Sequence, residues 1–171
     1  MLRPFNCLPR AVKLTSVFFL LCGLAFGQST AELAAIKKDV ASVQNAVSEA
    51  IGAAVPGWGY FPNAKGAYLD GYGIVVTAEV ALEPPLNPFT VQKTPEEVRK
   101  VTTQRRKDIE EKLTNLLKQK TASVDALAPN ESVAIIINIL NTNPAYVPDI
   151  PSQLVFSAKK QDSAHPISRT Y

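Results

Sequence analysis

The sequence predicts an α+β fold, in which one mainly antiparallel sheet packs against two helices. Two segments, 29–51 and 94–120, carry apolar residues at the three- and four-residue spacing of amphipathic helices. Four further segments are rich in β-branched or small apolar residues: 66–69, 72–82, 131–140 and 153–158. The order is therefore helix, strand, strand, helix, strand, strand. Runs of strands separated by single helices favour an α+β arrangement.

The first helix is predicted to begin at Ser29. Ser29-Thr30-Ala31-Glu32 fits a capping box, in which the serine oxygen and the Glu32 carboxylate each accept a free backbone N–H. Gly52 and Pro56 are expected to end the helix. Its apolar positions form one stripe: Leu33, Ile36, Val40, Val43, Val47 and Ile51. Under three heptads are short for a coiled coil, so we favour packing on the protein's own sheet over pairing with a second copy.

A β-hairpin is predicted where Asp70-Gly71 separates two β-prone runs. A two-residue primed turn needs positive φ at both positions, and Asp-Gly is a strong signal for it. Alternate residues of the second run then share one face of the strand: Ile74, Val76, Ala78, Val80 and Leu82. Segment 72–82 is therefore the most strongly indicated strand in the chain.

The second helix follows a proline-rich connector at 83–89. Thr94 is predicted as its N-cap, with Pro95 at the first helical position and Glu97 completing a capping box. Its apolar stripe contains Val98, Val101, Ile109, Leu113 and Leu116. Arg105 interrupts this stripe, and we expect its stem to lie on apolar surface with its guanidinium in water.

The last third of the chain is predicted to add two strands. A short helical turn is expected over 123–128, before segment 131–140, which is apolar on both faces. That pattern suits a central strand covered on both sides. A loop then leads to the strand at 153–158, and 161–171 reads as a polar tail. The single domain is expected to span residues 28–160.

The first 27 residues are typical of an export signal. Basic residues precede a 13-residue apolar run, Leu14–Phe26, and Ala25-Phe26-Gly27 places small residues at −3 and −1 before a cut ahead of Gln28. A membrane span needs about 20 apolar residues, so cleavage is favoured over an uncleaved anchor. A lipoprotein signal would need a small residue before Cys22, where the chain has leucine. The predicted location is periplasmic or secreted.

Removal of this segment changes the bulk composition. The segment contains three of the 18 Lys and Arg residues and none of the 15 Asp and Glu residues. Residues 28–171 therefore carry 15 basic and 15 acidic residues. Balanced charge argues against a nucleic-acid partner. Both cysteines, Cys7 and Cys22, also lie in the segment. The remaining 144 residues suit one domain that is stabilised by its core rather than by disulfides.

Few residues suit catalysis. The one histidine, His165, lies in the expected tail, which disfavours a Ser-His-Asp arrangement or a multi-histidine zinc site. We expect no metal and no cofactor. A hydrolase with paired carboxylates is an alternative, with Glu79 and Asp70 as its candidates; it needs two carboxyl groups within about 5–10 Å. Each also has a local explanation, since Asp70 suits the turn and Glu79 suits a strand position that faces solvent or meets a cation.

A cluster of aromatic residues is the candidate binding site. Aromatic side chains supply large contact areas, although such a set could equally pack in the core. The cluster falls within 15 residues: Trp58, Tyr60, Phe61, Tyr68 and Tyr72.

Three stretches, 68–76, 131–137 and 153–162, resemble a group of uncharacterised exported bacterial proteins. The resemblance covers 26 of 144 residues and implies a bacterial exported domain of unknown function. It supplies no catalytic residue.

The sequence thus favours a non-catalytic exported domain that binds a protein or cell-envelope partner through the Trp58–Tyr72 region or the first helix. The alternatives are the carboxylate-dependent hydrolase and a structural module that self-associates through the first helix. Membrane contact is expected only if the signal segment is retained. The oligomeric state stays open.

Overall fold

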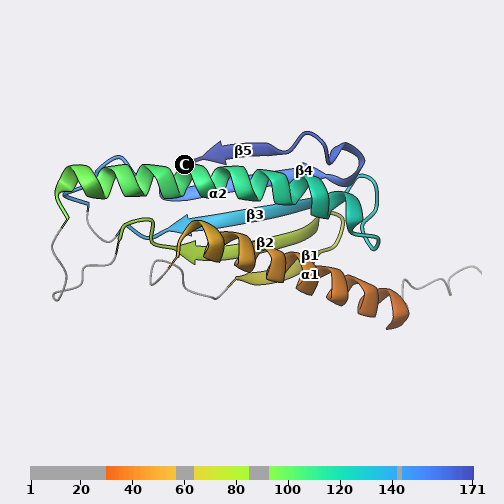
Figure 1. Ribbon diagram of the computed structural model, residues 1–171. Helices are drawn as coiled ribbons and strands as arrows, with labels where there is room; N and C mark the ends of the chain where they lie inside the picture. Colours follow the sequence, from red (N-terminus) through yellow and green to blue (C-terminus); the bar gives the residue numbers. More distant parts are fainter. Residues whose placement is uncertain (1–29, 57–63, 85–92, 142–143) are drawn as a thin grey trace, which may run out of the picture.

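A computed structural model describes residues 30–56, 64–84, 93–141 and 144–171 (Figure 1). It confirms the predicted α+β fold and the order of helix, hairpin, long helix and strands. The helices are α1 (Thr30–Ala54) and α2 (Pro95–Ser123), followed by a short 3-10 helix, η1 (Lys160–Asp162). The strands are β1 (Lys65–Leu69), β2 (Gly73–Val80), β3 (Ser132–Ile139), β4 (Gln153–Lys159) and β5 (Ile167–Thr170).

The five strands form one sheet in their order along the chain, β1-β2-β3-β4-β5. Three neighbouring pairs are antiparallel. The exception is β2 with β3, which run parallel because the connection between them crosses over through α2. The sheet is therefore mixed, with antiparallel pairing predominant as predicted.

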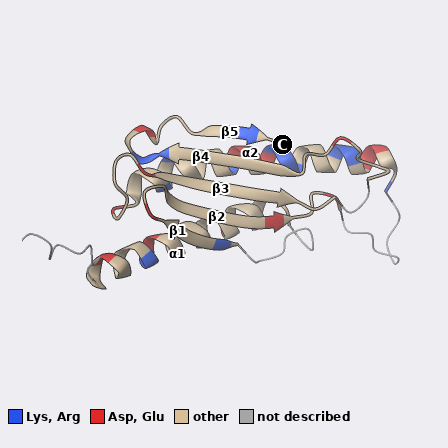
Figure 2. Ribbon diagram, turned by 180° about the vertical axis from the view of Figure 1, so that it is seen from behind, with Lys and Arg blue, Asp and Glu red and all other residues tan. Residues whose placement is uncertain are grey.

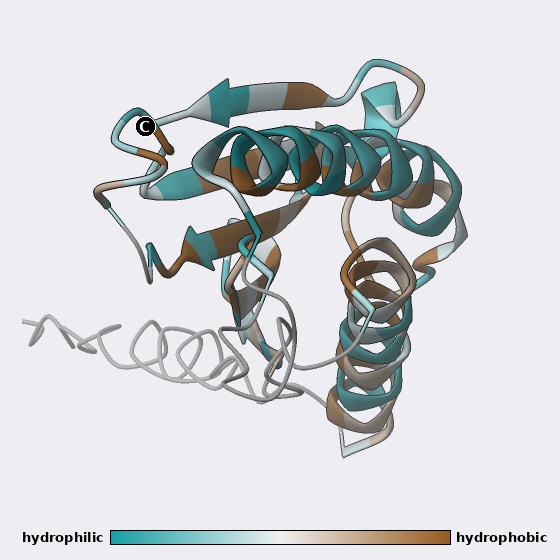
Figure 3. Cartoon of the chain, turned by 60° about the vertical axis from the view of Figure 1, so that its left-hand side comes forward, coloured by the Kyte–Doolittle hydropathy of each residue, from teal (hydrophilic) through white to brown (hydrophobic). Residues whose placement is uncertain are grey.

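Both helices lie on the same face of the sheet (Figures 1 and 3). α1 contacts β1 and β2, whereas α2 contacts β3 and β4. The register aligns apolar residues under the helices, with Ile74 opposite Val133 and Val76 opposite Ile135. The core between the layers also contains Val80, Ile109, Leu113, Leu117, Ile137, Leu154 and Phe156.

The apolar stripe of α1 packs on the protein's own sheet, as we favoured. Val43, Val47 and Ile51 are fully buried in the core. Leu33, at the start of the helix, is 41% exposed. Gly52 lies within α1 rather than ending it, and Pro56 follows soon after its last residue. Ser29, the expected N-cap, lies outside the described residues.

The predicted capping box of α2 is present. Thr94 Oγ1 accepts the Glu97 amide (3.3 Å), while Glu97 Oε2 accepts the Thr94 amide (2.8 Å). The helix continues to Ser123, so the helical turn expected over 123–128 is wrong: Val124 is the C-cap in an extended conformation and a turn follows.

Arg105 does not extend its guanidinium into water as expected. Its Nη1 donates to the carbonyl oxygens of Leu82 and Glu83, at 3.0 Å each. These carbonyls follow β2, where the chain leaves the sheet, and no described strand pairs with them. Burial lowers the pKa of Arg105 from its ordinary value. The side chain thus links α2 to the end of β2.

The hairpin forms around Asp70-Gly71, with Tyr72 N donating to Leu69 O (3.0 Å). The register places Leu69 opposite Gly73, so three residues connect the strands rather than two. Gly71 (φ 72°) and Gly73 (φ 118°) both have positive φ.

Two further predictions for the last third of the chain are wrong. β3 is central, but among the described residues helices cover only one face of the sheet, and Ile136 on the other face is only partly buried. The expected polar tail contains η1 and β5, so the folded part extends to Thr170. β5 has no buried residue and forms through backbone pairing with β4. In the described part of the chain, no helix is long and apolar enough to cross a membrane; residues 1–29, which hold the predicted signal, lie outside it.

Candidate interaction surface

The two candidate catalytic carboxylates lie at opposite ends of β2. Asp70 is in the hairpin turn that precedes the strand, and Glu79 is the seventh of its eight residues. At about 3.3 Å per residue, the strand separates them by about 20 Å. That distance exceeds what a paired-carboxylate mechanism requires, which is about 5–10 Å. The two residues therefore do not form one site.

His165 is highly exposed, as the sequence suggested. Its Nδ1 lies 2.6 Å from Asp162 Oδ1, three residues earlier. This local pair closes the turn between η1 and β5. Among the described residues, no group of three or more His, Cys, Asp or Glu side chains could hold a metal ion.

The structure describes two of the five candidate aromatic residues, Tyr68 and Tyr72. Tyr68 is partly buried on the helix-facing side of β1, and its hydroxyl donates to Glu131 Oε1 (2.6 Å). Tyr72 lies in the hairpin turn and is 45% exposed. Trp58, Tyr60 and Phe61 lie outside the described residues. The aromatic cluster as a whole therefore stays a prediction.

A second candidate surface is the side of the sheet that faces away from the helices, which we call the open face (Figure 2). Strand alternation and the register assign its residues, because residues that are paired across strands point to the same side. It carries Lys65, Ala67, Leu69, Val75, Thr77, Glu79, Ser132, Ala134, Ile136, Asn138, Gln153, Val155, Ser157, Lys159, Ile167 and Arg169.

The middle of the open face consists of two rows that cross all five strands. One row is small and apolar: Ala67, Val75, Ala134, Ser157 and Ile167. The next has a cation at each edge: Lys65, Thr77, Ile136, Val155 and Arg169. Ile167 is 56% exposed, and Val75, Ile136 and Val155 are partly buried. The face therefore has an apolar centre, and this second row ends in a cation on each edge strand.

One end of the open face is polar. Gln153 Nε2 donates to Asn138 Oδ1 (2.9 Å), which links β4 to β3. Beside this pair, a shallow hollow of about 210 Å³ is lined by Lys65, Thr77, Ala78, Glu79 and Asn138. The hollow contains one carboxyl group and offers no second one for hydrolysis.

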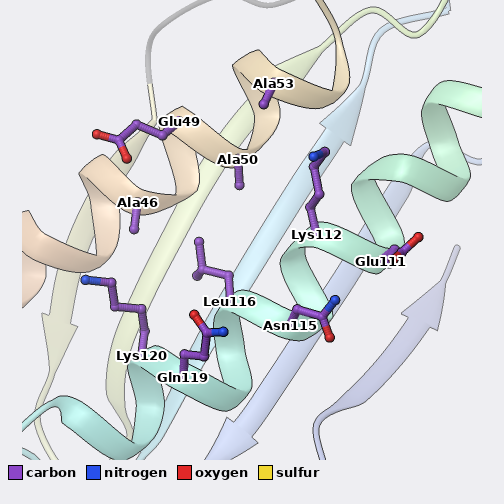
Figure 4. A pocket seen from close by; sticks show the side chains of 10 residues that line it. All are labelled: Ala46, Glu49, Ala50, Ala53, Glu111, Lys112, Asn115, Leu116, Gln119 and Lys120. Atoms are coloured by element: carbon purple, nitrogen blue, oxygen red, sulfur yellow. The ribbon is translucent and has the colours of Figure 1, made fainter.

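A wider groove of about 560 Å³ runs between the helices on the opposite side of the molecule (Figure 4). Ala46, Ala50 and Ala53 of α1 face Leu116 of α2 along its floor, and Lys112, Lys120, Glu49 and Glu111 border it. The groove is open and its charges are balanced.

Sequence reasoning missed the open face because it followed each strand separately. Ala134, Ile136 and Val155 alternate with core residues, and a run that is apolar on both faces also fits a strand that is covered on both sides. Only the pairing of β2, β3, β4 and β5 shows that these residues form one surface.

Comparison with protein-family models, with curated proteins and with solved structures finds no match.

Proposed function

We propose that this protein is an exported, non-catalytic domain that binds a protein or cell-envelope partner through the open face of its sheet. The observation that supports the proposal is the apolar centre of that face: Val75, Ala134, Ile136 and Val155 form a contiguous group over three neighbouring strands. Contiguous apolar surface of this kind commonly marks an interaction site. Export is inferred from the basic and apolar pattern of residues 1–27.

Two alternatives have less support. The hydrolase lacks paired carboxylates, since Asp70 and Glu79 lie about 20 Å apart along β2. Self-association through the stripe of α1 would need residues that are now part of the core, since Val43, Val47 and Ile51 are fully buried. By contrast, a partner could bind the open face without displacing residues of the core or either helix.

Site-specific photocrosslinking in the envelope fraction tests the proposal. A photoreactive amino acid at Val155, in the middle of the open face, should capture one partner, identified by mass spectrometry. The matched control carries the same amino acid at Lys100, an exposed position on α2. The purified partner should then bind the unmodified protein and lose at least about tenfold in affinity for Ile136→Arg.

Leu33→Arg is the control for that substitution, because Leu33 is an exposed apolar residue of α1 that is remote from the open face. Thermal unfolding shows whether each variant is folded. Equal crosslinking from Val155 and Lys100, or unchanged affinity of a folded Ile136→Arg variant, contradicts the proposal. N-terminal sequencing of the mature protein tests export separately, and we expect the chain to begin at Gln28.

A further inference from the structure

We propose that β5 is a docking edge, at which a short extended segment of a partner protein adds to the sheet as a sixth strand and sets an acidic side chain beside Arg169. This inference rests on the proposed function, because it specifies how a protein partner would reach the open face. Three observations support it. Helix α1 occupies the β1 edge, backbone groups of β5 point away from β4, and Arg169 gives the β5 edge a positive charge.

The β1 edge is occupied by α1. The amide of Gly66 points away from β2 and donates to Gln44 Oε1 of the helix (3.0 Å). A Cβ on Gly66 would lie only 2.8 Å from Val40 Cγ1, so the helix approaches this strand closely. An added strand would have to displace α1 from the outer backbone groups of β1. This edge is therefore closed to strand addition.

The β5 edge is free in the described part of the chain. Gln153 and Tyr171 exchange two backbone hydrogen bonds, with Tyr171 N to Gln153 O at 3.0 Å and Gln153 N to Tyr171 O at 3.2 Å. Hydrogen-bonded and non-hydrogen-bonded pairs alternate in an antiparallel ladder. The backbone N–H and C=O groups of Ser168 and Thr170 consequently point away from β4. No described side chain bonds to them, and such an edge is a template for another strand.

The side chains of β5 define what such a strand would carry. Ile167 and Arg169 both lie on the open face, beside Ser157 and Val155 respectively. The guanidinium of Arg169 forms no hydrogen bond or ion pair with any described residue. Directly opposed side chains on paired strands lie about 5 Å apart, so a carboxylate opposite Arg169 would be in ion-pair range. In an antiparallel partner strand, an acidic residue would therefore lie opposite Arg169. An apolar residue two positions later would lie against Ile167.

A second copy of this chain fits the edge less well. The two-fold pairing that uses both outward residues sets Ser168 opposite Thr170 of the second copy. That register places the two copies of Arg169 directly opposite each other, and opposed like charges are destabilising. The short strand, preceded by Pro166, also limits the pairing to a few residues. These features favour a short segment of a different protein.

A phage-displayed library of random eight-residue peptides, selected against the purified protein, tests the proposal. We expect enrichment of peptides that carry an acidic residue two positions before an apolar one. Ser168→Pro removes the outward N–H without removing a bond to β4, and it should weaken selected peptides at least about tenfold. Ser168→Ala keeps the N–H and is the matched control, for which affinity should be unchanged.

Charge reversal supplies the second measurement. Arg169→Glu should invert the preference of the selected peptides from an acidic to a basic residue at that position. Lys159→Glu changes a cation of the same face on β4 and should leave the preference unchanged. No enrichment, or enriched peptides that bind folded Ser168→Pro as well as they bind Ser168→Ala, overturns the proposal.

The two proposals fail in different ways. If Val155 captures a partner that binds Ser168→Pro normally, the open face is the interaction surface and the docking edge is refuted. If neither the crosslinker nor the library identifies a binder, both are refuted.

Discussion

The hydroxyl of Tyr68 donates a 2.6 Å hydrogen bond to Oε1 of Glu131, 63 residues further along the chain. Glu131 is 5% exposed, and its Oε2 accepts the backbone amide of Ala128 at 2.8 Å. One carboxyl group therefore joins edge strand β1 to the turn that precedes β3. A buried carboxyl group needs such partners, because its hydration is lost on folding.

Removal of the Tyr68 hydroxyl should destabilise the protein. Tyr68→Phe leaves Glu131 Oε1 buried without this donor, and we expect a loss of about 1–3 kcal/mol in the free energy of unfolding. The control is Tyr72→Phe, since Tyr72 is exposed in the hairpin turn and its hydroxyl has no described partner. That variant should remain within about 0.5 kcal/mol of the wild type. Urea unfolding measures both, and equal stabilities would contradict the structural role of the bond.

The same pair predicts a dependence of stability on alkaline pH. The hydrogen bond to Glu131, then burial, then the nearby negative charge raise the pKa of Tyr68 from 10.0 to about 12. A raised pKa in the folded state means that folding favours the neutral phenol. This contribution is complete below pH 10 and is lost as the pH rises to about 12. Ultraviolet titration should show a late-ionising tyrosine that is missing from Tyr68→Phe.

Local patterns were enough to predict most of the fold. The helical stripe that contains Val43 and Val47, the capping box at Thr94 and the Asp70-Gly71 turn each depend on residues close together in sequence. Their physical causes are side-chain periodicity, satisfaction of free amides and a turn that tolerates positive φ at Gly71. For these elements, the structure adds boundaries and one extra turn residue.

The features that sequence reasoning missed depend on distant partners. β5 has no buried side chain, so its sequence lacks the hydrophobic alternation that would predict a strand. It forms through backbone pairing with β4. Arg105 was expected to reach water. Its contact with the carbonyls of Leu82 and Glu83 was not predicted, because these groups lie 22 residues or more away in sequence. Tyr68 and Tyr72 are close in sequence but lie on the helix-facing side and in the turn. Surfaces of this sheet could not be assigned before strand pairing was known.

The capping box of α2 should contribute measurably to stability. Thr94→Ala removes the oxygen that accepts the Glu97 amide, and we expect a loss of about 1 kcal/mol. Thr103→Ala is the control, because Thr103 is exposed within the same helix and alanine is the better helix former. Thermal unfolding should rank Thr94→Ala below the wild type and Thr103→Ala at or above it. The reverse order would contradict this account.

The capping box also predicts an effect of acid. The hydrogen bond from the Thr94 amide, then that from its hydroxyl, lower the pKa of Glu97 from 4.5. A lowered pKa means that folding favours the charged carboxylate, so the contribution is present above pH 4.5 and is lost as the pH falls below it. NMR titration should show the Glu97 carboxyl group ionising at lower pH than in Thr94→Ala. Identical titration curves would contradict the assignment.

Gly73 should be the least replaceable glycine in the hairpin. Its φ of 118° lies where side-chain-bearing residues are strained, and a Cβ there would lie 2.1 Å from the carbonyl oxygen of Ser132. That backbone cannot move freely, because the Ser132 amide donates to Tyr72 O at 2.8 Å and pairs β3 with the start of β2. Gly73→Ala should therefore cost about 3 kcal/mol or more in the free energy of unfolding.

Gly71→Ala is the matched control. Its φ is also positive, at 72°, but a Cβ there meets nothing within 4 Å. The expected loss is therefore the backbone strain alone, about 1 kcal/mol. Urea unfolding of the two variants separates strain from collision, and equal losses would show that Ser132 yields to the added carbon.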